Sequence, residues 1–152
     1  MIIICDIDGT IADGSHRIHL IQNKPKNWDA YFGLAGGDTP IQPVIAFIKN
    51  MIATDESSST KIYFVSGRSS VCRKATEKWL DEHFGFTYEA LIMREEGNHE
   101  LDDKLKARIL KDHFLDKGID KQDIVVFDDR QRVVDMWRKN GILCFQPRNG
   151  DF

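Results

Sequence analysis

The strongest constraint on the fold is the alternation of short, wholly apolar runs with longer stretches of helical periodicity. Five runs rich in β-branched and aromatic residues predict strands: 2–6, 61–66, 90–93, 123–128 and 142–145. Apolar residues spaced three and four apart predict four helices: 41–54, 69–84, 102–116 and 130–140. Strands that are apolar on both faces and separated by helices predict an α/β fold with a mostly parallel central sheet covered on both sides.

Composition favours one soluble domain over residues 1–152. The chain has 41% hydrophobic and 30% charged residues and a net charge of −3, and it lacks an apolar stretch approaching the ~20 residues that span a bilayer. The chain has three cysteines, Cys5, Cys72 and Cys144, and no CxxC pair of the kind that binds zinc, so we expect a reducing, cytoplasmic location. The absence of a long apolar stretch predicts no membrane contact. The net acidity gives no overall attraction to nucleic acid, which confines any polyanion binding to one face.

Polar residues follow three of the predicted strands. They are Asp6 and Asp8 after 2–6, Ser66, Gly67 and Arg68 after 61–66, and Asp128 and Asp129 after 123–128. Because ligands bind outside the carboxyl ends of strands in open α/β sheets, we expect these groups to converge. Several carboxylates in one crevice need a cation, and oxygen-only ligands favour Mg²⁺. Either acidic pair alone would be an ordinary turn or helix cap, but together with "SGR" they indicate a phosphoryl-transfer site.

Residues 13–40, here called the flap segment, have no clean periodicity. Basic and aromatic side chains alternate within it: His16, Arg17, His19, Lys24, Lys26, Trp28, Tyr31 and Phe32. Charges for phosphates and rings for stacking are what a single strand of nucleic acid requires. The alternative is that Trp28, Tyr31 and Phe32 pin the segment to the core, since aromatic residues dominate core packing.

The four chemical motifs occur in the order found in a known superfamily. "DIDGT" resembles the first motif of the haloacid dehalogenase (HAD) phosphatases, "VSGR" the second and "FDD" the fourth, with a lysine expected between them. "CRKATEKWL", "MREEG" and the ending "DDRQRVVDMWRKNGILCFQPRNGDF" are similar to the 3′-phosphatase domain of bacteriophage polynucleotide kinase–phosphatases. The resemblance implies a Rossmann-like, HAD-type three-layer sandwich with a small flap at 13–40 and no large cap domain.

The resemblance also implies roles for individual residues. Asp6 resembles the nucleophile that forms an aspartyl-phosphate, and Asp8 the general acid whose backbone carbonyl also binds Mg²⁺. Asp128 would hold Mg²⁺ together with Asp6, with Asp129 in support. Ser66, Thr10, Gly67, Arg17 and Arg68 complete the set expected around the substrate phosphate, and Arg17 points toward a polynucleotide end.

The motif lysine is expected on the helix that begins near residue 102. Asp102, Asp103 and Lys106 fit the family pattern Asp-Asp-x-x-Lys, which favours Lys106. Lys104 is the alternative, and the two lysines point to different faces of the helix. Asp102 is expected to hold the catalytic lysine in place.

The resulting hypothesis is a Mg²⁺-dependent phosphatase that removes 3′-terminal phosphates from polynucleotides during nucleic-acid end repair. The spacing leaves no room for a cap, and an open site suits a strand end. No G-x-x-x-x-G-K-[ST] occurs, so we expect a stand-alone phosphatase with any kinase or ligase as a separate partner.

Three alternatives remain at this point. The first is a small-molecule phosphatase acting on phosphorylated nucleotides, such as a nucleotidase, and the second is a metal-dependent nuclease. The third is a receiver-type phosphoacceptor domain. Such domains accept phosphate on an aspartate near the third strand, but here the strand 90–93 ends in Met93 and Arg94, which argues against this alternative.

Overall fold

A computed structural model describes residues 1–150, so the last two residues of the C-terminal motif, 151 and 152, lie outside the described residues. The main sheet contains β1 (Ile2–Cys5), β4 (Lys61–Ser69), β5 (Ala90–Arg94), β6 (Ile124–Phe127) and β7 (Leu143–Phe145). The longer helices are α3 (Gln42–Ala53), α4 (Arg73–His83), α5 (Asp102–His113) and α6 (Gln131–Lys139). Short 3₁₀ turns follow α5, namely η4 (Leu115–Lys117) and η5 (Lys121–Asp123). The predicted α/β fold class is confirmed.

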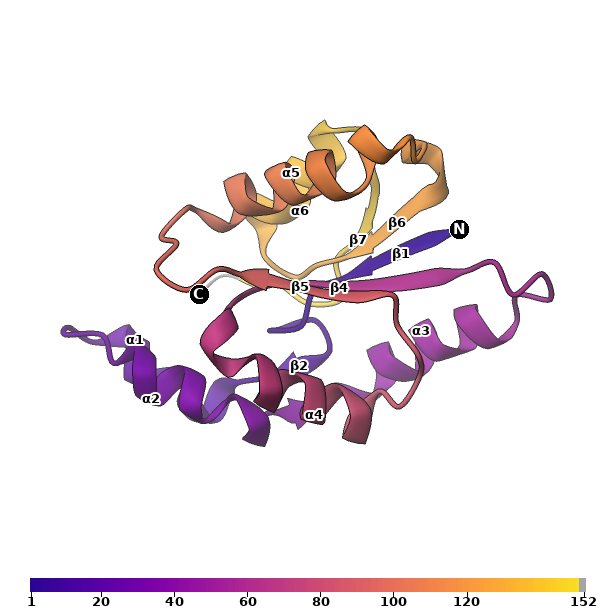
Figure 1. Ribbon diagram of the computed structural model, residues 1–152. Helices are drawn as coiled ribbons and strands as arrows, with labels where there is room; N and C mark the ends of the chain where they lie inside the picture. The colour runs from indigo at the N-terminus through magenta and orange to yellow at the C-terminus, as the bar shows by residue number, and fades with distance from the viewer. Residues whose placement is uncertain (151–152) are drawn as a thin grey trace.

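The sheet has the order β5-β4-β1-β6-β7, and each neighbouring pair is parallel. Helices α5 and α6 cover one face, while α3, α4 and the flap segment cover the other (Figure 1). The strand order reverses at β1, which has β4 on one side and β6 on the other. The crevice outside the carboxyl ends of these three strands is therefore the expected ligand site.

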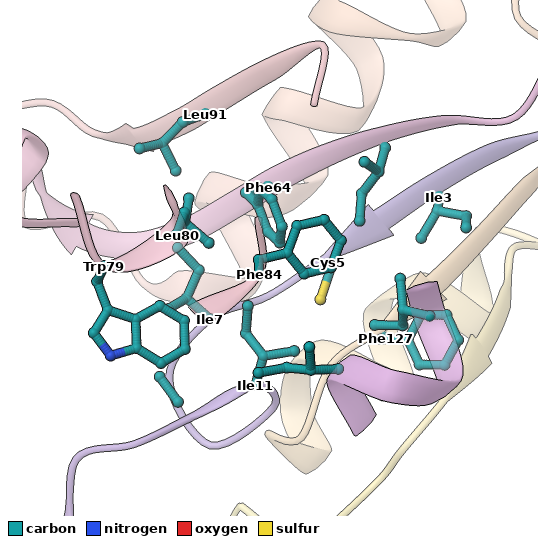
Figure 2. Packing of buried hydrophobic residues seen from close by; sticks show 14 of the residues in the cluster. Ile3, Cys5, Ile7, Ile11, Phe64, Trp79, Leu80, Phe84, Leu91 and Phe127 are labelled. Carbon is teal, nitrogen blue, oxygen red and sulfur yellow. The ribbon is translucent and has the colours of Figure 1, made fainter. Parts of the chain in front are cut away.

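Alternation along β1 assigns its side chains to two cores. Ile3 and Cys5 belong to the core under α3 and α4, together with Phe64 and Trp79 (Figure 2). Ile4 belongs to the core under α5 and α6. Since side chains alternate with a period of two, the residue after Cys5 continues on the α5 face, where Asp6 meets Lys106.

Strand β4 extends three residues beyond the predicted 61–66 because Ser69 pairs with Arg94 of β5 across a register shift. The extension directs two neighbouring residues to opposite faces of the sheet. Arg68 contacts the flap segment, whereas a Cβ at Gly67 would lie 2.7 Å from Asp102 of α5. The helix predicted from residue 69 consequently begins with the 3₁₀ turn η3 (Ser70–Cys72), followed by α4.

The flap segment folds into short pieces, which explains why its sequence shows no periodicity. They are η1 (Ser15–Arg17), α1 (His19–Gln22), α2 (Trp28–Gly33) and η2 (Ala35–Gly37), between β2 (Ala12–Asp13) and β3 (Thr39–Pro40). Strands β2 and β3 pair antiparallel at its base. No helix in the part of the chain that the structure describes is long and apolar enough to cross a membrane.

Candidate active site

Three carboxylates meet at the carboxyl ends of β1 and β6. Asp6, Asp128 and Asp129 are buried, and one carboxylate oxygen of each lies within 4.8 Å of the others. The backbone N–H of Asp6 donates to the carbonyl of Phe127 at 2.9 Å, which continues the parallel pairing beyond the strands. The indole N–H of Trp137 donates to Asp128 Oδ2 at 3.1 Å and orients that carboxylate. The sheet register thus brings together the acidic groups that the sequence separates by more than a hundred residues.

Lys106 lies between two of these carboxylates. Its side chain is 4% exposed, and its Nζ lies 2.9 Å from Asp6 Oδ1 and 2.7 Å from Asp128 Oδ2. Burial disfavours its charge, but Asp128 and Asp6 outweigh that effect and raise the pKa of Lys106, which keeps the ammonium charged. Lys104, two residues earlier on α5, is exposed. Lys106 is therefore the lysine of α5 that can reach a phosphate at this edge.

The donor set fits a hard divalent cation. With all three carboxylates ionised and the Lys106 ammonium charged, the cluster has a net charge of −2. Asp129 Oδ2 is buried without a hydrogen-bond partner among residues 1–150. Burial, with the nearby Asp128 charge, raises the pKa of Asp129 to about 6, and burial also raises the pKa of Asp6. A Mg²⁺ ion would satisfy the unpartnered oxygen and offset the repulsion.

Substitutions of Asp128 and Asp129 are expected to have opposite effects on the stability of the metal-free protein. Asp129→Asn removes a like charge and is expected to raise the melting temperature by about 2–4 °C, the shift for about 1 kcal/mol. Asp128→Asn is expected to lower it, because Lys106 and Trp137 lose their charged acceptor. Mg²⁺ should stabilise wild type but stabilise Asp129→Asn less than half as much. Full Mg²⁺ stabilisation of Asp129→Asn in differential scanning fluorimetry would show that Asp129 is not a ligand.

Two buried arginines converge on Asp8, two residues after Asp6. Arg17 Nη2 donates to Asp8 Oδ1 at 2.6 Å, and Arg68 donates to both Asp8 oxygens at 2.9 Å. The Asp8 side chain is 24% exposed, whereas both guanidinium groups are buried. Although burial opposes ionisation, Arg68 and Arg17 lower the pKa of Asp8 below its ordinary value. Guanidiniums also suit phosphate oxygens, but here Asp8 accepts their N–H groups, so a phosphate would have to displace it.

Asp38, at the end of the flap segment, holds both arginines and was not singled out from the sequence. Its Oδ1 accepts from Arg17 Nε at 2.7 Å and lies 3.0 Å from His16 Nε2. Its Oδ2 accepts from Arg17 at 2.6 Å and from Arg68 at 2.5 Å, while its carbonyl accepts from the Trp79 indole at 2.7 Å. Asp38 is buried, and with Asp8 it balances the two guanidinium charges.

Asp38→Asn is expected to destabilise the protein by about 2–3 kcal/mol, because an amide NH₂ must then face guanidinium donors. KM for any phosphate substrate should rise at least about tenfold, since misplaced guanidiniums bind the phosphate less well. Asp13→Asn, a change at a half-buried side chain of the same segment, should change stability by less than about 1 kcal/mol. Urea unfolding and steady-state kinetics measure both effects. An unchanged KM in a folded Asp38→Asn protein would exclude the positioning role.

The remaining predicted residues lie around this edge. Ser66 is buried, and its Oγ accepts from the Arg68 backbone N–H at 3.2 Å, so its own proton can be donated to a ligand. Thr10 is also buried, and its hydroxyl donates to Asp129 Oδ1 at 3.5 Å, which orients Asp129. Gly9 has a φ of +79°, and a Cβ there would lie 2.0 Å from Asp129 Oδ2, so the turn requires glycine.

The expectation that Asp102 holds the catalytic lysine is wrong. Asp102 instead pairs with Arg94 at the end of β5 and with Arg130 after β6. Arg94 also donates to the carbonyl of Gly67 at 3.0 Å, which ties this network to the end of β4. Lys106 is held by Asp6 and Asp128 because its long stem reaches inward along α5. Asp102 therefore supports the end of β4 near Gly67, and the acidic cluster holds the lysine.

The C-terminal segment packs over the acidic side of the site. The backbone N–H of Gly150 and the side chain of Gln146 both donate to the carbonyl of Asp129, at 3.0 and 2.8 Å. Arg148 donates to the carbonyl of Gly9 at 3.2 Å. A Cβ at Gly150 would lie 2.1 Å from Asp129 Oδ2, so this approach also requires glycine. These contacts fix the Gly9 turn and Asp129 relative to each other.

The aromatic residues of the flap segment have two candidate roles, stacking on nucleic acid and anchoring the segment to the core, and different residues fit each. Tyr31 is buried, and the Arg17 guanidinium lies 4.1 Å from the centre of its ring. Phe32 packs partly against the core. Trp28 is 45% exposed, stacks on Phe32 and has the Lys26 ammonium 5.4 Å from its ring centre. Tyr31 and Phe32 thus anchor the flap segment, and Trp28 faces solvent.

Comparison with known proteins gives consistent matches. The model of the family described as the Polynucleotide kinase PNKP phosphatase domain matches residues 1–152. A protein of Autographa californica nuclear polyhedrosis virus, named as a bifunctional polynucleotide kinase/RNA ligase, is 28% identical over 136 residues. That alignment covers 90% of this chain and 17% of the viral protein.

Solved structures share the fold over nearly the whole chain. A chain in the structure of a Pnkp1/Rnl/Hen1 complex superposes with a TM-score of 0.75 and 30% identity, over 99% of this chain and 46% of that one. A haloacid dehalogenase-like hydrolase from Streptococcus pneumoniae has a TM-score of 0.62 and 13% identity, covering 95% and 83% of the two chains. The present chain thus spans less than half the length of the viral protein and of the Pnkp1/Rnl/Hen1 chain.

Proposed function

The chain belongs to the family of the polynucleotide kinase PNKP phosphatase domain, within the HAD phosphomonoester hydrolases, and on this premise we propose that it removes 3′-terminal phosphates from polynucleotides. The reaction would be Mg²⁺-dependent and would pass through an aspartyl-phosphate. The main support for the proposal is that Asp6 belongs to an acidic cluster suited to a cation, and that Asp8, two residues later, is held by two buried arginines.

In the first step, an Asp6 oxygen attacks phosphorus, and the bond from phosphorus to the 3′ oxygen breaks. Lys106, Arg17 and Arg68 bind the phosphate oxygens, and the Ser66 hydroxyl donates to one of them. When bound by Asp6, Asp128, Asp129 and the Asp8 carbonyl, Mg²⁺ supplies positive charge that lowers the repulsion between Asp6 and the phosphate.

Asp8 is proposed to protonate the departing 3′ oxygen and then to take a proton from the water that attacks the aspartyl-phosphate. This second attack releases inorganic phosphate and restores Asp6. A carboxylate paired with two guanidiniums does not hold a proton at neutral pH. Proton transfer by Asp8 therefore requires the incoming phosphate to replace Asp8 as the acceptor for the N–H groups of Arg17 and Arg68.

Two features support a polynucleotide end over a small metabolite. Between Ser66 and Lys106 the chain forms α4 and β5, which belong to the main domain, so the flap segment is the sole insertion beside the site in residues 1–150. The exposed part of that segment carries Trp28 and Lys26, which suit a strand. We further propose that kinase and ligase activities, on other chains or on other parts of a longer one, act on the same ends.

The test compares a 3′-phosphorylated oligonucleotide with nucleoside monophosphates, each with Mg²⁺. The proposal predicts a higher kcat/KM for the oligonucleotide, with inorganic phosphate and a product of unchanged length. Faster turnover of the monophosphates would favour a nucleotidase. Shortened products from an unphosphorylated strand would identify a nuclease.

A further inference from the structure

An open groove of about 440 Å³ lies between the flap segment and the start of α4. One wall comes from α2 and includes Asp29 and Phe32. The other wall comes from η3 and the first turn of α4 and includes Val71, Cys72 and Lys74. None of these five residues takes part in the proposed reaction, so phosphate transfer at Asp6 does not explain the groove.

Each wall of the groove is tied to one of the two phosphate-binding arginines. On the α2 side, Arg17 stacks on the ring of Tyr31 and donates to its carbonyl at 3.3 Å, directly before Phe32. On the α4 side, Arg68 Nη1 donates to Thr76 Oγ1 at 3.2 Å, and Thr76 contacts Cys72 Sγ at 3.8 Å. Both walls of the groove are therefore connected, through Tyr31 and Thr76, to the buried guanidiniums that are proposed to receive the phosphate.

The surface of the groove is apolar, with cationic groups near it. Val71 is 56% exposed although it is aliphatic, whereas Cys72, which also lines the groove, is 6% exposed. Phe32 presents an aromatic ring that is held by stacking on Trp28 at 5.7 Å. Lys74 lines the α4 wall, and Lys26 lies close to Trp28. An apolar slot with adjacent ammonium groups matches a nucleobase attached to a phosphodiester.

Charge also gives the occupant a direction. Asp29, on the α2 wall, repels phosphate, whereas Lys74, on the α4 wall, attracts it. The strand backbone would therefore follow α4, with the base inserted toward Phe32 and Val71. A free phosphate would not contact the apolar surfaces, whereas a nucleotide can place its base on them and its phosphate at Lys74.

We propose that this groove binds the base of the 3′-terminal nucleotide of a single-stranded end, with Lys74 on the phosphodiester that precedes it. The inference rests on the proposed function, because it places the rest of the substrate whose 3′ phosphate lies at Asp6. It adds a specificity site made of Phe32, Val71 and Lys74, none of which contacts the reacting atoms.

The test uses a 3′-phosphorylated oligonucleotide, the same oligonucleotide with an abasic last nucleotide, and p-nitrophenyl phosphate. Wild type should prefer the intact end over the abasic end by about tenfold in kcat/KM, as expected for one stacked base. Val71→Glu should reduce that preference below about threefold while leaving p-nitrophenyl phosphate turnover unchanged. Val71 is exposed, so the substitution is compatible with folding.

A charge-matched pair tests the second contact. Lys74→Glu should raise KM for the intact oligonucleotide about tenfold and leave kcat unchanged. Lys78→Glu, one turn further along α4 and outside the groove, changes the net charge equally and should have less than about a twofold effect.

The outcomes separate this inference from the proposed function. If wild type hydrolyses the oligonucleotide efficiently but Val71→Glu retains the full preference, the groove proposal is overturned and the phosphatase function stands. If Lys78→Glu raises KM as much as Lys74→Glu, the groove contact is likewise excluded. If wild type hydrolyses monophosphates faster than the oligonucleotide, the proposed function fails, and the groove inference fails with it.

Discussion

Asp6→Asn is expected to reduce phosphate release by about 10⁴-fold or more, because a neutral amide cannot displace the 3′ oxygen from phosphorus. The substitution keeps the size of the side chain and removes one of three crowded carboxylates, while Lys106 retains Asp128 as a partner. The free energy of unfolding should therefore stay equal or rise. Initial rates on a 3′-phosphorylated oligonucleotide and urea unfolding measure the two effects.

A loss of activity together with a loss of folding would remove the support for Asp6 as the nucleophile, so the unfolding measurement is the control. Residual activity above about 1% in a folded Asp6→Asn protein would contradict covalent catalysis at this residue. Asp13→Asn serves as the matched aspartate because its side chain, 30% exposed, lies outside the acidic cluster.

Lys106→Met is expected to destabilise the metal-free protein by about 3–5 kcal/mol, because it leaves Asp6 and Asp128 as buried charges without their shared partner. Saturating Mg²⁺ should recover part of this loss by replacing some of the missing positive charge. Activity with Mg²⁺ should still fall by about 10²–10³-fold, since a group that stabilises charge in the transition state is lost. Chemical denaturation with EDTA and with Mg²⁺ separates the stability effect from the catalytic one.

Lys104→Met is the control for this prediction. The residue is exposed on the same helix, and its loss should change stability by less than about 0.5 kcal/mol and leave activity unchanged. Equal effects of the two substitutions, or a larger effect of Lys104→Met, would show that the inward lysine has been assigned incorrectly.

The residues that the sequence locates best are those at the ends of strands. Apolar runs fix the strands, and the parallel arrangement then forces Asp6 and Asp128 to the same edge. The predicted fold and the resemblance to the HAD phosphatases of the PNKP type are both confirmed. The roles of the individual residues remain predictions that the substitutions above address.

The parts that could not be predicted depend on tertiary contacts of aperiodic segments. Asp38 meets Arg17 and Arg68 at sequence separations of 21 and 30 residues, across a flap segment whose short turns carry no hydrophobic period. Asp102 and Lys106 are four residues apart on α5, which suggests a pair, but arginines from the ends of β5 and β6 bind Asp102 first. Competition of this kind is visible only in three dimensions.

Transfer of the phosphate from the nucleic acid to the protein distinguishes covalent catalysis at Asp6 from direct attack by water. The protein is mixed with an oligonucleotide that carries a radiolabelled 3′ phosphate and is quenched in acid within milliseconds, and the labelled peptide is then mapped. Covalent catalysis at Asp6 should give transient label on the peptide that contains Asp6, and none in Asp6→Asn. Rapid phosphate release from wild type with no label on the protein, or label on a peptide without Asp6, would contradict it.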